Sequence, residues 1–195
     1  MFCSLTPIMC ADRTRKFSGR GRQSVSPDSN DSNGQAIAIP EGYTIRPARV
    51  DDSGNISQIF QQAPQAARWS ERATWEILGS PRIFAYVAYG SREEENSIRQ
   101  IVAFAAGRIV ATEGEVLNVA VMKTHRQIGL ARALVATLLG EFEREFVTRV
   151  FLEVRESNYA ATELYRRMGF SALGRRSGYY QDPPEAALIF EKLLG

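Results

Sequence analysis

The chain has 195 residues, of which 44% are hydrophobic, and a formal net charge of +2. A chain of this length holds one domain rather than two, and no apolar run approaches the roughly 20 residues of a membrane-spanning helix. The five basic and three acidic residues of the first 40 positions account for all of the net charge. The rest of the chain is therefore neutral and lacks the basic excess of a nucleic-acid-binding domain.

Residues 1–40 differ in composition from the rest, with six serines, three glycines and three prolines but no apolar periodicity. Such a segment cannot bury enough apolar surface to offset its conformational entropy, so we expect a disordered tail followed by a folded domain over 41–195. Both cysteines, Cys3 and Cys10, lie in this tail. The domain has no thiol for a disulfide or a metal cluster, which favours a reducing, cytoplasmic setting without a metal. The tail is either a cytoplasmic extension or the product of a start codon assigned too far upstream.

The first half of the domain alternates short strand and helix patterns. Residues 43–49 alternate as a strand does, and 56–63 have apolar residues at helical spacing. Ser70 is a suitable N-cap for a second helix, which Gly79 ends. Strands are predicted over 82–89, 99–109 and 115–122, with a charged turn at 91–97 between the first two.

The second half begins with a helix over about 130–146, whose apolar side carries Leu130, Leu134, Leu138, Phe142 and Phe146. A buried strand over 150–154 and a helix over about 158–168 follow, and Gly169 lies just past the end of that helix. Closing strands are expected around 170–176 and 186–193. The order βααβββαβαββ predicts an α/β fold, a mixed sheet of about seven strands with helices on both faces.

A loop at Arg126–Ala131 connects a predicted strand to a predicted helix. The start of a helix exposes about four unpaired N–H groups and the positive end of the helix dipole, which together suit a diphosphate. Gly129 has no Cβ to keep phosphates away, Ala131 is nearly as small, and Arg126 and Arg132 add positive charge. The alternative is an ordinary strand–loop–helix connection that contains one glycine.

A carboxylate and a phenol lie on the strand and the helix that follow. In the strand, Val150, Leu152 and Val154 share one face, and Glu153 lies on the other face. A carboxylate within an apolar strand must be solvated, paired or used, so Glu153 is either a general base or the partner of an arginine. Tyr165 lies on the apolar side of its helix and is either a general acid or a core tyrosine. Asn158 opens that helix, as a cap or as a ligand-binding residue.

These segments resemble the Gcn5-related N-acetyltransferase (GNAT) family, and most closely its RimI-like branch of ribosomal-protein-alanine N-acetyltransferases. The resemblance covers about 43–193. Its most specific part is LEVRESNYAATELYRRMGF at 152–170, supported by LNVAV at 117–121, the RxxGxA loop, RWSE at 68–71 and RRSGYY at 175–180. The resemblance implies a mostly antiparallel sheet, acetyl-CoA as a substrate and a peptide N-terminus as the acceptor.

The resemblance also implies a role for each site residue. Glu153 would be the general base and Tyr165 the general acid. The acetyl-CoA site would comprise Val119, Ala120, Val121, Arg126, Gln127, Ile128, Gly129, Leu130, Ala131, Arg132, Asn158 and Tyr165. Trp69, Tyr179 and Tyr180 would flank the acceptor peptide, and the resemblance implies that this acceptor is an N-terminal alanine of a small-subunit ribosomal protein.

Three positions depart from the family pattern: Ile128 replaces a small or polar residue, His125 replaces a tyrosine, and Ala186 replaces an acidic residue near the acceptor end.

We expect no direct contact with nucleic acid or membrane, and a monomer or weak dimer. The alternatives are an enzyme of the same family that acetylates lysine or a small amine, and a non-catalytic sensor that binds acyl-CoA.

Overall fold

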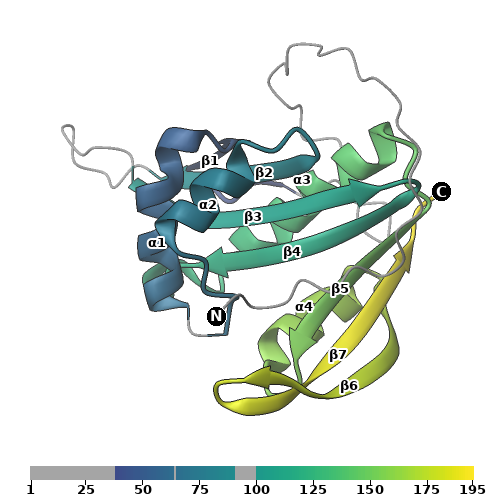
Figure 1. Cartoon of the computed structure of the whole chain (residues 1–195). Helices are drawn as coiled ribbons and strands as arrows, with labels where there is room; N and C mark the ends of the chain where they lie inside the picture. Colours follow the sequence, from purple (N-terminus) through teal and green to yellow (C-terminus); the bar gives the residue numbers. More distant parts are fainter. Residues whose placement is uncertain (1–37, 64, 91–99) are drawn as a thin grey trace.

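The computed structural model describes residues 38–63, 65–90 and 100–195, so the predicted charged turn and the predicted tail up to residue 37 lie outside these ranges. Within the described ranges seven strands form one sheet, in the order β1-β2-β3-β4-β5-β7-β6. Figure 1 shows α1 and α2 on one face of the sheet and α3 and α4 on the other. Neighbouring strands are antiparallel except β4 and β5. The predicted α/β fold and element order are confirmed.

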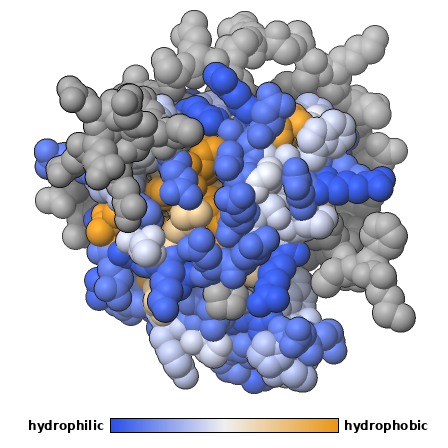
Figure 2. Space-filling view, turned by 90° about the vertical axis from the view of Figure 1, so that its left-hand side faces the viewer, coloured by the Kyte–Doolittle hydropathy of each residue, from blue (hydrophilic) through white to orange (hydrophobic). Residues whose placement is uncertain are grey.

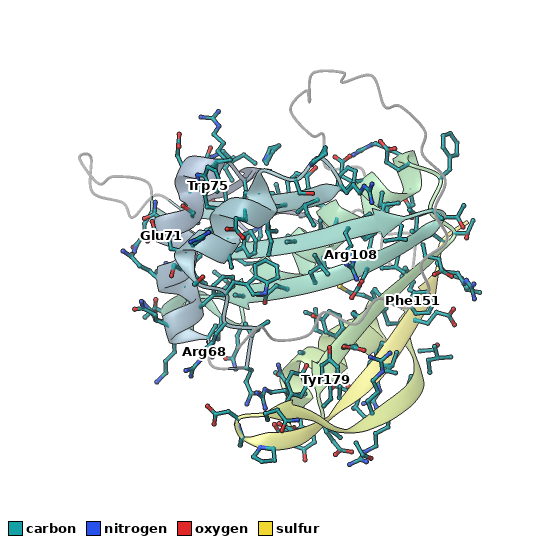
Figure 3. The ribbon with its side chains drawn as sticks, viewed as in Figure 1. Arg68, Glu71, Trp75, Arg108, Phe151 and Tyr179 are labelled. Atoms are coloured by element: carbon teal, nitrogen blue, oxygen red, sulfur yellow. The ribbon has the colours of Figure 1, made fainter. Side chains whose placement is uncertain are left out.

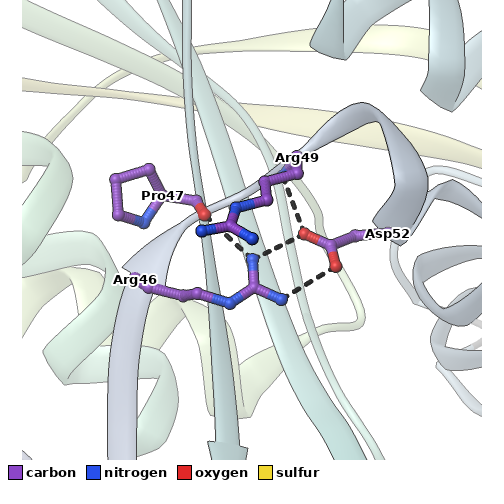
Figure 4. A network of polar contacts seen from close by, with 4 residues as sticks. All are labelled: Arg46, Pro47, Arg49 and Asp52. Carbon is purple, nitrogen blue, oxygen red and sulfur yellow. Dashed lines mark hydrogen bonds and ion pairs between the residues drawn. The ribbon is translucent and has the colours of Figure 1, made fainter. Parts of the chain in front are cut away.

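The chain enters the fold through β1 (Tyr43–Pro47), the 3₁₀ turn η1 (Val50–Asp52) and α1 (Ser53–Gln62). An ion pair fixes this entry (Figure 4). Arg46 donates to both carboxylate oxygens of Asp52, over 2.7 and 2.8 Å, and the backbone N–H of Arg49 donates to the same carboxylate over 2.7 Å. The Asp52 side chain is only 10% exposed, so the network orients α1 on the end of β1.

Local capping signals determine the next helix. α2 (Glu71–Leu78) begins after Ser70, whose Oγ accepts a hydrogen bond from the Ala73 N–H over 3.1 Å, and it ends at Gly79, as predicted. Strand β2 (Ile83–Gly90) follows and pairs with β1 on one side.

The centre of the sheet consists of β3 (Gln100–Val110) and β4 (Glu113–Val121). A 3₁₀ turn η2 (Lys123–His125) then leads to α3 (Leu130–Arg144). Two glycines of these strands seat the α3 side chain Phe142, because a Cβ at Gly107 or Gly114 would lie 2.6 or 2.8 Å from its ring. Phe142 itself is fully buried, so the glycines allow α3 to lie close to the sheet.

One core prediction is wrong. Phe146 was expected on the apolar side of α3, but the helix ends at Arg144 and the Phe146 side chain is 84% exposed. The chain turns sharply there, with a φ of 59° at Phe146. Val147 is buried instead, and its N–H donates to the Phe142 carbonyl over 2.9 Å. The prediction extended the helix past this turn because it relied on the helical spacing of apolar residues alone.

The C-terminal elements are β5 (Arg149–Arg155), α4 (Tyr159–Arg167), β6 (Ser171–Gln181) and β7 (Pro184–Leu193). Residues of β5 alternate between buried and half-buried as predicted. β6 continues five residues beyond the predicted 176, because its pairing with β7 resumes at Tyr180 after an irregular stretch. β6 is an edge strand and is exposed along nearly all of its length, so hydrophobic alternation does not mark where it ends.

The sheet opens between β4 and β5. These two strands pair only through four residues of each, Glu113–Val116 with Arg149–Leu152. The β3–β4 register places Asn118 opposite Ala106 and Val116 opposite Gly107, so Leu117 is an extra residue. Such a bulge bends its strand. Beyond Val116, β4 therefore turns away from β5 and the sheet has a gap in its middle.

Candidate functional site

The gap between β4 and β5 is a cleft that opens to solvent. It is lined by Gln65, Ala66, Ala67, Val116, Leu117, Asn118, Val119, Leu152, Glu153, Val154, Asn158, Ala161, Tyr165 and Tyr180. The α1–α2 loop borders it from one face of the sheet and α4 from the other. Because the sheet is open here, side chains from opposite faces meet in one space. Five predicted site residues are brought together: Val119, Glu153, Asn158, Tyr165 and Tyr180.

The view onto the α1 and α2 end of the molecule shows a mainly hydrophilic surface (Figure 2). Hydrophobic surface shows between the hydrophilic side chains near the middle of that face. In Figure 3, Arg68 and Glu71 lie at this end, whereas Tyr179 lies on the side formed by β5, β6 and β7. The lining of the cleft includes residues from both parts, Gln65 to Ala67 from the α1–α2 loop and Glu153 and Tyr180 from the C-terminal strands.

Tyr165 reaches the cleft from α4. Its side chain is 7% exposed, and its ring packs edge-on against Phe170 with 5.7 Å between ring centroids. Burial, and to a lesser degree the nearby Tyr180, raises the pKa of Tyr165 above its usual value. The phenol therefore stays protonated at neutral pH and can act as a proton donor, while its ring has the packing expected of a core tyrosine.

Glu153 reaches the cleft from β5. Its Oε1 lies 2.8 Å from Nη1 of Arg176 on β6, and the carboxylate is 21% exposed. Burial and a hydrogen bond to Glu153 raise the pKa of Tyr179, which therefore stays neutral beside the carboxylate. The predicted arginine partner is thus present, and the carboxylate still borders the cleft.

Of the three β4 residues in the predicted acetyl-CoA site, Val119 to Val121, one lines the cleft. Val119 lines the cleft, whereas Ala120 is buried with 3% exposure. The Val121 carbonyl accepts a hydrogen bond from Nε of Arg126 over 3.0 Å. Of the three residues, Val119 is therefore the one that faces the open space.

The predicted diphosphate loop leaves the start of α3 without a side-chain cap. Gly129 is the N-cap of α3 with φ 96° and provides no side-chain cap, and Gln127 also has a positive φ of 64°. At such a φ only glycine is unstrained, so Gly129 is required by its conformation. A Cβ there would meet only Pro40, at an ordinary contact of 3.6 Å. The first N–H groups of α3 thus have no side-chain cap.

Other side chains of this loop have structural contacts. The second guanidinium contact of Arg126 is with the Gln62 carbonyl at the end of α1, over 2.7 Å. Leu130 is buried in the core with 1% exposure, whereas Ile128 is 43% exposed. His125 packs edge-on against Tyr43, with ring centroids 6.0 Å apart. The loop residues lie outside the set that lines the cleft.

Asn158 has the capping geometry that was the alternative to ligand binding. Its Oδ1 accepts a hydrogen bond from the Ala161 N–H over 3.2 Å at the start of α4. The residue also lines the cleft, so the two functions are compatible at one position.

The predicted acceptor-side aromatics differ in their placement. Trp69 packs against Phe60 and Phe104 with ring centroids 5.8 and 6.0 Å away, so it anchors the α1–α2 loop to the core. Tyr180 lines the cleft and meets Tyr179 edge-on at 5.1 Å. Burial and the nearby Glu153 raise the pKa of Tyr180 to about 12.

Asn118 is a site residue that the sequence did not single out. It is 5% exposed, lines the cleft, and its Nδ2 donates to the Ala67 carbonyl over 2.8 Å. One amide thereby joins β4 to the α1–α2 loop. A polar residue inside the apolar string LNVAV was the available signal.

Among the described residues, no group of three or more His, Cys, Asp and Glu side chains is placed to hold a metal ion. In the same part of the chain, no helix is both long and apolar enough to cross a membrane.

Comparison with known proteins identifies the family. The acetyltransferase (GNAT) family model matches residues 55–170. The ribosomal protein bS18-alanine N-acetyltransferase of Escherichia coli is 39% identical over 132 residues, covering 67% of this chain and 84% of the relative. An N-alpha-acetyltransferase of Saccharolobus solfataricus is 32% identical over 172 residues, covering 77% and 93%.

Solved structures agree with this family. The crystal structure of the ribosomal-protein-S18-alanine N-acetyltransferase from Escherichia coli matches with a TM-score of 0.67 and 30% identity, covering 78% of this chain and 94% of that one. Arabidopsis thaliana NAA60 in complex with acetyl-CoA shares the fold, with a TM-score of 0.71 at 21% identity and coverage of 78% and 98%. The chain belongs to the GNAT family and is an acetyl-CoA-dependent N-acetyltransferase.

Proposed function

We propose that this acetyltransferase moves the acetyl group of acetyl-CoA to the free α-amine of a protein N-terminus, with an N-terminal alanine of a ribosomal protein as the acceptor. The observation that carries the proposal is the 39% identity to a relative named for that reaction. The meeting of Glu153, Tyr165 and Tyr180 in one cleft supports it further.

The chemistry of the acceptor favours an α-amine. An α-amine has a pKa near ~8, so roughly a tenth of it is neutral at pH 7. A lysine amine, with a pKa near ~10.4, is neutral in only about one molecule in 2,500. The difference is about 2.4 pKa units, or roughly 3.3 kcal/mol, which a lysine acetylase must supply in addition. A carboxylate already held by an arginine, as Glu153 is, suits the easier deprotonation.

Two residues of this chain would move the protons. Acetyl-CoA supplies the thioester carbonyl that the neutral amine attacks, with formation of a C–N bond and cleavage of the C–S bond. Glu153, directly or through water, would accept the proton that leaves the nitrogen. Tyr165 would donate its proton to the departing sulfur, and burial keeps that proton on the phenol until negative charge develops there.

The remaining residues would hold the two substrates. The uncapped start of α3 at Gly129 would bind the diphosphate through backbone N–H groups, with Gln127, Ile128, Ala131 and Arg132 around it. Val119 and Asn158 would face the arm that carries the thioester. Tyr180 would form one wall for the acceptor peptide and the loop Gln65–Ala67 the opposite wall. The cytoplasmic setting, the monomer or weak dimer, and the lack of direct contact with nucleic acid or membrane stay predictions.

The test is release of free thiol from acetyl-CoA by the purified chain. One peptide carries a free N-terminal alanine, and a matched peptide is blocked at its N-terminus and carries a lysine. Turnover on the free N-terminus alone is expected. Turnover on the blocked peptide alone would make the protein a lysine acetylase, and turnover on neither peptide would contradict a peptide acceptor.

A further inference from the structure

Arg155, the last residue of β5, donates three hydrogen bonds to the β6–β7 turn and the residues beside it. Its Nη2 donates to the Asp182 carbonyl over 2.8 Å. Its Nη1 donates to Oε2 of Glu185 over 3.1 Å and to the Pro183 carbonyl over 3.3 Å. The side chain is only 11% exposed. The two carbonyls belong to the turn between β6 and β7, and Glu185 is the second residue of β7, so one guanidinium ties the turn to the start of β7.

The same guanidinium lies over the ring of Tyr180, with 4.1 Å between its Cζ and the ring centroid. Tyr180 lines the cleft, and the Tyr179 ring packs edge-on against it. A cation at this distance over a tyrosine ring attracts the ring and restricts its orientation. Arg155 itself does not line the cleft, so it acts on that space through Tyr180.

Glu185 extends the contact to the start of α4. Its carboxylate accepts a hydrogen bond from the Ser157 N–H as well as from Arg155, and these bonds hold its pKa below the usual value. Ser157 precedes Asn158, which lines the cleft. The β6–β7 turn, the end of β5 and the residue before the N-cap of α4 are therefore linked through one arginine and one glutamate.

We propose that Arg155 is a positioning residue for the acceptor: it fixes the β6–β7 turn and the Tyr180 ring in the place where they form one wall of the peptide site. The inference rests on the proposed function, because it assigns the Tyr180 wall to the acceptor. The planar guanidinium suits this task, since its donors reach two carbonyls and a carboxylate while its face covers the ring. A lysine ammonium at the same position could satisfy only part of this set.

Kinetics with the two substrates varied separately test the assignment. In Arg155→Met, which keeps the apolar length of the side chain, the KM for the peptide should rise by about tenfold or more because the wall is displaced. The KM for acetyl-CoA should stay at the wild-type value. Arg155→Lys should recover part of the loss. A merely structural arginine would affect both substrates alike, and that result would overturn the proposal.

Arg175→Met is the matched control. Arg175 also joins β6 to the segment between β5 and α4, through two bonds of 2.8 and 2.9 Å to Glu156, but its side chain is 51% exposed and it contacts neither Tyr180 nor the turn. Its peptide KM should match that of the wild type. A rise equal to that of Arg155→Met would show that any ion pair of this hairpin has the same effect, which would refute a special role for Arg155.

Two further measurements separate this inference from the proposed function. Amide hydrogen exchange in the full chain should show faster exchange over 178–185 in Arg155→Met and Arg155→Lys than in the wild type, whatever the acceptor is; unchanged exchange would refute the inference. With a Tyr180→Ala variant, addition of Arg155→Met should raise the peptide KM little further, since the ring is already gone. Full additivity of the two effects would show that Arg155 does not act through Tyr180. Failure of the wild type to acetylate the peptide would instead count against the proposed function alone.

Discussion

Removal of the Tyr165 hydroxyl separates catalysis from folding in this protein. Tyr165→Phe keeps the ring that packs against Phe170 and deletes only the polar atom that can donate a proton in the cleft. Because the side chain is 7% exposed and its ring contacts remain, the free energy of unfolding should change little. A loss of activity in this variant therefore measures the hydroxyl itself.

The expected loss follows from the chemistry of a positioned acid. General acid catalysis contributes about 10²- to 10⁴-fold, which corresponds to roughly 2.7–5.4 kcal/mol of the activation barrier. Burial raises the pKa of Tyr165 further, so the phenol is a weak acid that gives up its proton only as negative charge forms on the sulfur. We therefore expect the lower end, a fall in kcat of about 100-fold.

The assay measures thiol release under saturating acetyl-CoA and peptide, together with calorimetric binding of CoA and the thermal midpoint of each variant. Binding and midpoint should match the wild type. Tyr159→Phe is the control, because Tyr159 lies on the same helix with 79% of its side chain exposed and should retain full turnover. A Tyr165→Phe enzyme with the kcat of the wild type would refute the proposed acid.

Three further predictions concern the base, the entry network and the loop anchor. Glu153→Gln should mainly alter the pH profile of kcat, and a profile and rate like those of the wild type would leave the residue as the partner of an arginine alone. Burial opposes the charge of Asp52, but the bonds from Arg46 and the backbone hold its pKa below the usual value. Their stabilisation is therefore complete above the unfolded pKa of about 4 and is lost as the pH falls through the folded value. Asp52→Asn should lower the free energy of unfolding by about 2 kcal/mol and the thermal midpoint by about 4–8 °C at pH 7, with a smaller difference near pH 3; an equal difference at both pH values would contradict this. Asn118→Ala leaves the Ala67 carbonyl without its donor, at a cost of about 1–3 kcal/mol. Its peptide KM should rise more than its acetyl-CoA KM, and equal changes would assign Asn118 to general stability.

Local chemistry made much of the fold predictable. The α2 boundaries follow from the Ser70 cap and from Gly79, and the β5 faces follow from simple alternation. Helical spacing failed at Phe146, because the reversal of the chain at a positive φ ends α3 before the apolar pattern does. Hydrophobic spacing predicts which residues share a face of a helix or strand, but it does not predict where the backbone turns.

The site was predictable where a residue belongs to a regular element and not where it depends on a distant partner. Tyr165 was placed on the apolar side of its helix, and it is buried there. The partner of Glu153 is Arg176, and the partner of Asn118 is the Ala67 carbonyl. Such pairs join segments that are far apart in the chain, and tertiary packing selects them from many equally charged or polar neighbours. One sequence carries no signal that would choose among these partners.

The short pairing of β4 with β5 is the weakest connection within the sheet. On one side lie four strands with α1, α2 and α3, and on the other lie three strands with α4, and only four residue pairs of ladder connect them. A ligand that hydrogen-bonds along the free edge of β4 would supply the missing rungs of that ladder. We therefore expect bound substrate to hold the two parts of the sheet together. Release of the product should let them move apart again before the next turnover.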